Sequence, residues 1–232
     1  MVLLNSVFEA NQRSFKFTCL TGLAFCLAGL LLSAGCSKGL VGRTPDVSKI
    51  WICDEEADNA LQRQDYEVGI LLHQQFLEKK PRNGLALYHL GYAYGQTGEH
   101  LKEVSYYEKA IRRGFQEDRI FFNLGMAYGE LNEGKKSVRA FKKALEINPD
   151  NADNHFGLAV AYQRNCNDKL AEEEFLRVIK IDPNHLDALL YLSMLYADLG
   201  ELQRARELLR KILEVDPSHR TARQFLESVE KE

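Results

Sequence analysis

Histidine and cysteine are the residue types in this sequence best suited to binding a metal ion, so we consider their spacing first. No two histidines lie four residues apart, the spacing that places two ligands on one face of a helix, and no cysteine stands at a zinc-ligand spacing from them. The histidines are His73, His89, His100, His155, His185 and His219. The pattern favours surface or turn histidines and predicts no metal site.

Catalytic motifs are also missing from the sequence. No glycine-rich phosphate loop follows a strand pattern, and no serine stands in a nucleophile elbow. We therefore predict that the chain is not an enzyme, has no catalytic residues and takes no cofactor.

The stretch before Cys36 has the order of a secretory signal. Arg13 and Lys16 precede the uncharged residues 17–35, and this run ends in the small residues Ser33, Ala34 and Gly35. Residues 32–36 resemble the bacterial lipobox, in which the signal is cut before a cysteine that carries a diacylglycerol. The resemblance implies that residues 1–35 are a lipoprotein signal peptide. Cys36 would then be the lipidated N-terminus, open to palmitate labelling.

The same stretch predicts where the protein resides. By the rule known for enteric bacteria, Ser37 after the cysteine implies the outer membrane, with the folded part facing the periplasm. The alternative is an uncleaved inner-membrane signal anchor, because the 19 uncharged residues come close to the roughly 20 that cross a bilayer. The long stretch before Arg13, which contains Glu9, suggests a start codon downstream of Met1.

The charge of the remaining chain excludes one class of partner. Without residues 1–36, 28 Lys and Arg stand against 32 Asp and Glu, a net charge of −4. A nucleic-acid-binding protein needs a basic surface, so we expect no nucleic-acid partner.

A spacing of 34 residues organises the rest of the chain. Four separate columns share it, which predicts a repeat architecture. They are the tyrosines Tyr94, Tyr128, Tyr162 and Tyr196, the leucines Leu90, Leu124, Leu158 and Leu192, each followed by a small residue, the turn residues Gly98, Asn132, Cys166 and Gly200, and the prolines Pro81, Pro149, Pro183 and Pro217, with Phe115 at the missing place.

These columns resemble the tetratricopeptide repeat (TPR), a helix-turn-helix unit of 34 residues. The resemblance covers residues 50–219 and implies an all-α fold, a right-handed α-solenoid of TPR units. Five units are predicted at 50–83, 84–117, 118–151, 152–185 and 186–219. A lipidated N-terminal linker at 36–49 precedes them, and a capping helix at 220–232 follows. The first unit is degenerate, as is expected of a terminal repeat.

The turn column carries a local prediction. Gly98, Asn132 and Gly200 suit a left-handed backbone between the two helices of a unit. Cys166 would be strained there, so we expect local distortion at that turn. Cys53 and Cys166 lie three units apart, beyond the roughly 7 Å limit of a disulfide. We expect free thiols, with an intermolecular bridge as the alternative.

In TPR proteins the first helix of each unit lines a concave groove. Slots 5 and 9 of units two to five are apolar and share one helical face, which predicts a continuous strip: Tyr88, Tyr92, Phe122, Met126, Phe156, Val160, Leu190 and Met194. Slot 2 predicts a polar rim of Arg119, Asp153 and Asp187. Exposed apolar patches of this size are typical of binding surfaces, so we predict a groove for a partner protein or peptide. The alternative is a strip covered by residues 37–49 or by a second copy of the chain, as in a homodimer.

A signal, a lipidated cysteine and an array of TPR units together look similar to the pilotin-type TPR lipoproteins that help type IV pilus secretins assemble. The resemblance implies a membrane-anchored adaptor or scaffold in envelope assembly. A scaffold for cell-wall hydrolases or polysaccharide export would use the same groove. A self-associating structural array would use the groove as its dimer interface.

Overall fold

The structure is a computed structural model that describes residues 52–231, and this part of the chain is built of consecutive α-helices. Within it we find eleven helices and no strand. They are α2 (Glu55–Gln62), α3 (Tyr66–Lys79), α4 (Gly84–Gln96), α5 (His100–Arg112), α6 (Asp118–Glu130), α7 (Gly134–Ile147), α8 (Ala152–Arg164), α9 (Asp168–Ile181), α10 (Leu186–Asp198), α11 (Leu202–Val215) and α12 (Arg220–Val229).

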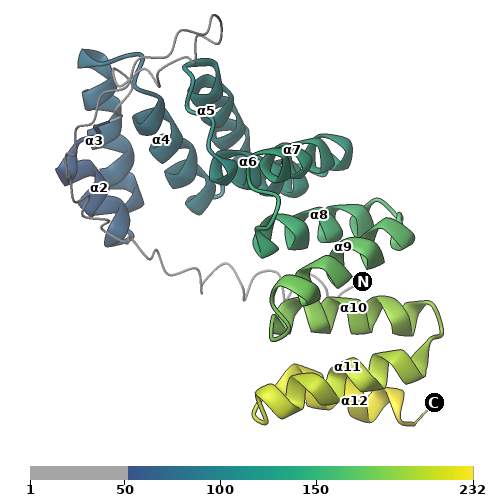
Figure 1. Cartoon of the computed structure of the whole chain (residues 1–232). Coiled ribbons are helices and arrows are strands. Elements are labelled where there is room, and N and C mark those ends of the chain that lie inside the picture. The colour runs from purple at the N-terminus through teal and green to yellow at the C-terminus, as the bar shows by residue number, and fades with distance from the viewer. Residues whose placement is uncertain (1–51, 232) are drawn as a thin grey trace, which may run out of the picture. The chain divides into compact units, whose positions relative to one another are not determined.

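Each helix packs against the next one along the chain, as Figure 1 shows. The helices α4, α6, α8 and α10, which we call the A-helices, each form a hairpin with the helix that follows. They begin at Gly84, Asp118, Ala152 and Leu186, and α12 begins at Arg220, all at the 34-residue spacing seen in the sequence. The predicted all-α TPR solenoid is confirmed.

Polar side chains fix where several helices begin. The Asn83 side chain accepts a hydrogen bond from the amide of Ala86 (2.9 Å), and Asn151 does the same for Asn154 (3.0 Å). In the last two units histidines take this place: the Nδ1 atoms of His185 and His219 accept from the amides three residues on. Such caps satisfy amides that have no partner in the first helical turn. His185 and His219 are therefore turn histidines, as predicted.

The small residues of the leucine column allow the two helices of a unit to approach closely. A Cβ atom on Gly91 would lie 2.5 Å from the buried Tyr107 ring, and one on Gly125 would lie 2.9 Å from Phe141. Both rings come from the second helix of the same unit. The tyrosine that follows each small residue, such as Tyr94, is buried at the same seam.

Phe115, at the place of the missing proline, is part of the core. Its side chain is 1 % exposed, and its ring centroid lies 5.2 Å from that of Tyr88. Gly114, with φ of 92°, turns the chain so that the Phe115 amide can donate to the Ala110 carbonyl at 3.1 Å. A proline could provide neither the aromatic ring nor the amide hydrogen of this hydrogen bond.

The turn between the two helices has the same conformation in all five units. The column residues Gln64, Gly98, Asn132, Cys166 and Gly200 all have positive φ, with values of 65°, 78°, 56°, 56° and 78°. At Cys166 the closing hydrogen bonds are intact, with Cys166 N to Gln163 O and Asn167 N to Tyr162 O both at 3.0 Å. The expected distortion is therefore wrong. The backbone keeps the common turn because two hydrogen bonds close it. The cost is an unfavourable positive φ at Cys166, a residue with a Cβ atom.

This strain predicts that Cys166→Gly will stabilise the protein. A residue with a Cβ atom in the left-handed conformation destabilises the folded state by roughly 1–2 kcal/mol. Glycine removes this cost, but it loses more backbone entropy on folding, which offsets part of the gain. The Cys166 side chain is exposed, so little packing is lost. We expect a gain of about 1 kcal/mol and a rise in Tm of about 2–4 °C, measured by circular dichroism. Cys166→Ala, which keeps the Cβ atom, should leave Tm unchanged, and an equal rise in both variants would contradict the prediction.

None of the helices in residues 52–231 is both long enough and apolar enough to cross a membrane. The predicted signal peptide, the lipidated Cys36 and the linker at 36–49 lie outside the described residues.

Candidate functional site

The eight apolar residues predicted to line the groove, which we call the A-helix strip, lie on successive A-helices. Tyr88 and Tyr92 are on α4, Phe122 and Met126 on α6, Phe156 and Val160 on α8, and Leu190 and Met194 on α10. Helix α4 contacts α6, and α6 contacts α8, although the second helix of a unit separates them in sequence. The A-helices thus lie next to one another along one side of the array.

Two residues of the A-helix strip belong to the core. Tyr88 is 3 % exposed and Leu190 is 2 % exposed. The Tyr88 ring stacks on Tyr107 at 5.6 Å, and its hydroxyl accepts a hydrogen bond from Asn123 Nδ2 at 3.1 Å. The prediction of an exposed apolar strip is wrong for these two residues. Slot 5 turns partly into the seam between units, where the next unit covers it.

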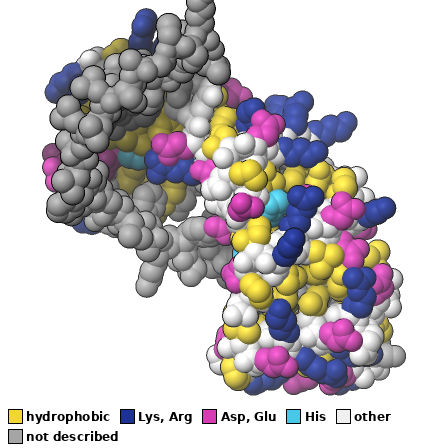
Figure 2. Space-filling view, viewed as in Figure 1, with side chains coloured by type: hydrophobic (Ala, Val, Ile, Leu, Met, Phe, Trp, Pro, Cys, Tyr) yellow, Lys and Arg dark blue, Asp and Glu magenta, His cyan; other side chains and the backbone are white. Residues whose placement is uncertain are grey.

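The other six residues of the strip are half-buried. Some make aromatic contacts: Phe122 meets the edge of Phe141 at 5.5 Å, and Phe156 stacks on His185 at 5.1 Å. Met194 packs against the core cluster that contains Leu189 and Leu209, whereas Met126 on α6 and Val160 on α8 are half-buried. Figure 2 shows hydrophobic side chains interleaved with charged ones over α8 to α11. Half-buried apolar groups with firm support beneath them can bury further area against a partner.

The predicted rim residues already have partners within the chain. Arg119 forms an ion pair with Glu117 at 2.6 Å, and its guanidinium lies over the rings of Tyr88 (5.1 Å) and Phe115 (5.4 Å). Asp153 lies 3.9 Å from His185 Nε2. Burial alone would lower the pKa of His185, but Asp153, Asp187 and Asp182 together raise it above its ordinary value. Arg119 and Asp153 have about half of their side-chain surface exposed, so each remains accessible to a partner.

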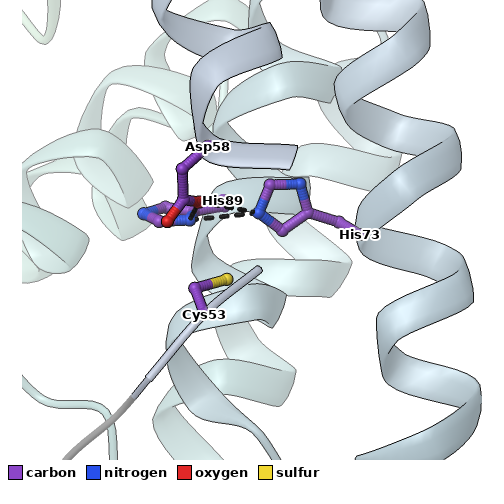
Figure 3. A group of neighbouring side chains, drawn as sticks. All are labelled: Cys53, Asp58, His73 and His89. Carbon is purple, nitrogen blue, oxygen red and sulfur yellow. Dashed lines mark hydrogen bonds and ion pairs between the residues drawn. The ribbon is translucent and has the colours of Figure 1, made fainter. Parts of the chain in front are cut away.

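The prediction of surface or turn histidines is wrong for His73 and His155. His73 is fully buried, and His155 is 5 % exposed and pairs with Glu174 at 2.6 Å. His73 and His89 meet Asp58 and Cys53, as Figure 3 shows. We call these four residues the Cys53 cluster. Sequence spacing missed it because the residues come from the segment before α2 and from α2, α3 and α4.

The ionisable groups of the Cys53 cluster are strongly perturbed. Burial raises the pKa of the Cys53 thiol to about 12, with the Asp58 charge adding to the shift. Burial also raises the pKa of Asp58, but its close polar contacts with the His73 and His89 rings outweigh this effect and hold that pKa well below its usual range. Burial lowers the pKa of His89, although Asp58 opposes the shift. Such shifts arise where charged groups gather in a partly dry environment.

Both cysteines in the described part of the chain are free thiols, as predicted. Cys53 is half-buried within its cluster, whereas Cys166 is exposed in the turn of the fourth unit.

Three family profiles match the chain in separate segments. Two described as tetratricopeptide repeat match residues 55–117 and 171–228, and one described as TPR repeat matches residues 125–165. The chain belongs to the tetratricopeptide repeat family. The three profiles begin in the first predicted unit and end in the final helix, so the assignment extends through most of the described residues.

Solved structures of TPR proteins share the fold at low sequence identity. A crystal structure of MamA has a TM-score of 0.66 and 22% identity, covering 70% of this chain and 95% of that one. YrrB, described as a TPR protein with an unusual peptide-binding site, has a TM-score of 0.64 and 23% identity, covering 72% and 87%. Pseudomonas aeruginosa pilF has a TM-score of 0.62 and 18% identity, covering 68% and 72%. The comparison with curated proteins gives no match.

Proposed function

We propose that the chain is a membrane-tethered TPR scaffold whose A-helix strip binds an apolar or amphipathic segment of a partner protein. TPR arrays commonly serve as protein-interaction scaffolds, and this chain has that fold. The observation that carries the proposal is the incomplete burial of the A-helix strip. Six of its apolar side chains remain half-buried on adjacent helices.

The charges beside the strip restrict the chemistry of the partner segment. Arg119 lies on α6, whereas Asp153 and Asp187 lie on α8 and α10. A complementary segment would carry an acidic group toward α6 and basic groups toward α10, with apolar residues between them. YrrB, whose structure is described as having a peptide-binding site, shows that an array of this fold can hold a peptide.

The strip is tested with two substitutions at residues that are not fully buried. Met126→Glu and Val160→Glu place charges on α6 and α8 at half-buried positions. Peptides selected from a random library on the wild-type chain should bind the double variant at least about 30-fold more weakly, the effect of losing a hot spot of about 2 kcal/mol. Binding is measured by calorimetry, and circular dichroism checks the fold.

The matched control places glutamates on the second helices of two units. Leu101 on α5 is 75% exposed and Leu176 on α9 is 45% exposed. The Leu101→Glu and Leu176→Glu double variant should bind the selected peptides as the wild type does. Equal losses in the two double variants would count against the A-helix strip as the binding surface.

The tether is proposed to be a diacylglycerol on Cys36, holding the array at the outer membrane with its folded part in the periplasm. Its support is the order of charged, apolar and small residues before Cys36. Cys36→Ala should abolish palmitate labelling and release the protein from the membrane fraction. Labelling that persists in this variant would contradict the lipid anchor, and an unprocessed protein that stays in the inner membrane would point to a signal anchor.

The cellular role we propose is assembly of an envelope machine, with type IV pilus or secretin biogenesis as the first candidate. Its support is the order of signal, lipid cysteine and TPR units, together with the fold shared with Pseudomonas aeruginosa pilF. Deleting the gene should then reduce the amount of assembled secretin. A normal secretin with a defect in cell-wall cleavage or polysaccharide export would instead assign the scaffold to one of those systems.

A further inference from the structure

The Cys53 cluster brings four side chains with metal-binding atoms to one place. One ligand atom from each of Cys53, Asp58, His73 and His89 lies within 4.8 Å of the other three. Asp58 Oδ1 is 2.7 Å from His89 Nδ1 and 3.1 Å from His73 Nε2, and the two ring nitrogens are 3.1 Å apart. Figure 3 shows a ring nitrogen of His73 facing Asp58 and His89, with the Cys53 side chain beside them.

Two of these ligands, His73 and Asp58, occupy positions that are apolar in the later units. His73 takes the column that holds the buried Tyr107, Phe141, Phe175 and Leu209 at steps of 34 residues. Asp58 takes the column of Tyr92, Met126, Val160 and Met194. Polar groups at such positions cost free energy unless they are satisfied by strong partners. The departures of the first unit from the repeat pattern therefore converge on one site.

With both imidazole rings neutral, the close contacts within the cluster have too few protons between their ligand atoms. His73 Nδ1 lies 2.8 Å from the Gly69 carbonyl, which only accepts, so Nδ1 carries the proton. In the neutral ring Nε2 then points a lone pair at Asp58 Oδ1, which also only accepts. The proton on His89 Nδ1 cannot serve both of them. A cation would satisfy all of these lone pairs at once.

We propose that the Cys53 cluster is a structural zinc site. One thiolate, two imidazole nitrogens and one carboxylate form a four-ligand set of the kind that Zn²⁺ binds. Around tetrahedral zinc, nitrogen and oxygen ligands lie about 3.3 Å apart and sulfur lies about 3.6 Å from them, given bonds of about 2.0–2.3 Å. The contacts of 2.7 to 3.1 Å and the outer limit of 4.8 Å require only small side-chain movements to reach this geometry.

The surroundings of the cluster suit a structural ion. The hydrogen bond from His73 Nδ1 to the Gly69 carbonyl orients the ring, as outer-shell partners of zinc-bound histidines do. His73 is fully buried, whereas Asp58 keeps 31% of its side-chain surface exposed, which leaves a way in for the ion. On binding, the Cys53 thiol gives its proton to solvent, Asp58 binds as carboxylate and both histidines bind through unprotonated nitrogens. Four protein ligands close the coordination shell, which favours a structural role over catalysis.

The ion would fasten the end of the array. Helix α2 has 8 residues, whereas the A-helices have 13. Beyond the metal ligands, the segment before α2 is held to α4 by the hydrogen bond from Asn83 Nδ2 to the Ile52 carbonyl (2.9 Å). Zinc would join this segment, α2, α3 and α4 at a single point. It would thus supply stability that a terminal repeat, covered on one face only, lacks.

Cobalt binding to the full chain tests this site. Protein freed of metal with a chelator is titrated with Co²⁺, and we expect one ion per chain, intense visible bands of tetrahedral cobalt and a thiolate-to-cobalt charge-transfer band. Zn²⁺ should displace the cobalt and raise Tm. The charge-transfer band should vanish in Cys53→Ser and persist in Cys166→Ser, whose cysteine is exposed and remote in sequence. His89→Gln removes a direct ligand, so it should weaken cobalt binding by at least about 10–100-fold. Losing an outer-shell partner of a metal ligand already costs this much affinity.

The wild-type titration decides the question even if a variant folds poorly. Absence of stoichiometric cobalt and zinc binding would overturn the site and leave the four residues as a hydrogen-bonded cluster without a metal ion. A charge-transfer band that survives in Cys53→Ser would overturn it as well, because the thiolate would then come from another cysteine.

Discussion

Replacing Phe115 by alanine is expected to lower the free energy of unfolding by about 3–5 kcal/mol, the usual cost of removing a large buried aromatic ring. The side chain is 1 % exposed and lies in the core cluster that joins α4, α5, α6 and α7. Its ring contacts Tyr88 at 5.2 Å and supports the Arg119 guanidinium at 5.4 Å. Urea unfolding followed by circular dichroism measures the change.

A second variant at this position separates structure from repeat pattern. Phe115→Pro restores the proline of the other units, so the pattern alone predicts a neutral or stabilising change. The structure predicts a loss at least as large as that of Phe115→Ala, because proline also removes the amide that donates to Ala110. Gln116→Ala, at an exposed neighbour, is the control and should change stability by less than about 0.5 kcal/mol. A stable Phe115→Pro protein would contradict the packing described for α5 and α6.

The second large effect is a dependence of stability on pH caused by Glu103. This side chain is 7 % exposed and lies against the A-helix α4, where a Cβ atom on Gly95 would meet its carboxylate at 2.5 Å. Burial raises the pKa of Glu103 to about 7, although a hydrogen bond with His100 at 2.9 Å opposes the shift. Buried carboxylates behave in this way because the charged form loses its hydration.

The direction of the pH effect follows from which state binds the proton. Between the unfolded pKa of 4.5 and the folded pKa of about 7, the folded chain holds a proton on Glu103 that the unfolded chain has released. Stability should therefore rise as pH falls, by about 2–3 kcal/mol from about pH 8 to about pH 5. Urea unfolding at several pH values measures this slope.

Glu103→Gln should remove this part of the slope, because the amide stays neutral throughout. At about pH 8 the variant should be more stable than the wild type by about 2–3 kcal/mol, while near about pH 5 the two should be similar. Glu99→Gln, on an exposed residue paired with Lys102, is the control and should leave the slope unchanged. An identical slope in the wild type and in Glu103→Gln would show that Glu103 ionises normally.

The sequence was informative wherever the fold repeats itself. Columns such as Tyr94 and Leu90 recur at 34 residues because each fills the same seam, so counting offsets was enough to predict the helix pairs. The turn at Cys166 followed its column even against the preference of the residue. The two backbone hydrogen bonds that close this turn outweigh one unfavourable φ angle. The expected distortion considered only the preference of cysteine and not these hydrogen bonds.

The parts that were missed depend on packing between units. Tyr88 and Leu190 have the same slot as Phe122 and Phe156, yet only the first two are fully covered. The Cys53 cluster was missed for a related reason, since spacing along one helix says nothing of ligands contributed by neighbouring helices. One signal was present: His73 falls in a column of buried apolar residues, Tyr107 and Phe141 among them, and a buried imidazole needs polar partners.

Photo-crosslinking in cells of the organism that encodes the chain tests the central claim most directly. A photoreactive amino acid is placed at Met126 on α6 in one strain and at Leu176 on α9 in another. The account predicts a specific adduct with one other protein from Met126 and none from Leu176, and the purified partner should bind the wild-type chain but not the Met126→Glu and Val160→Glu variant. An adduct between two copies of this chain, or equal adducts from both positions, would contradict it.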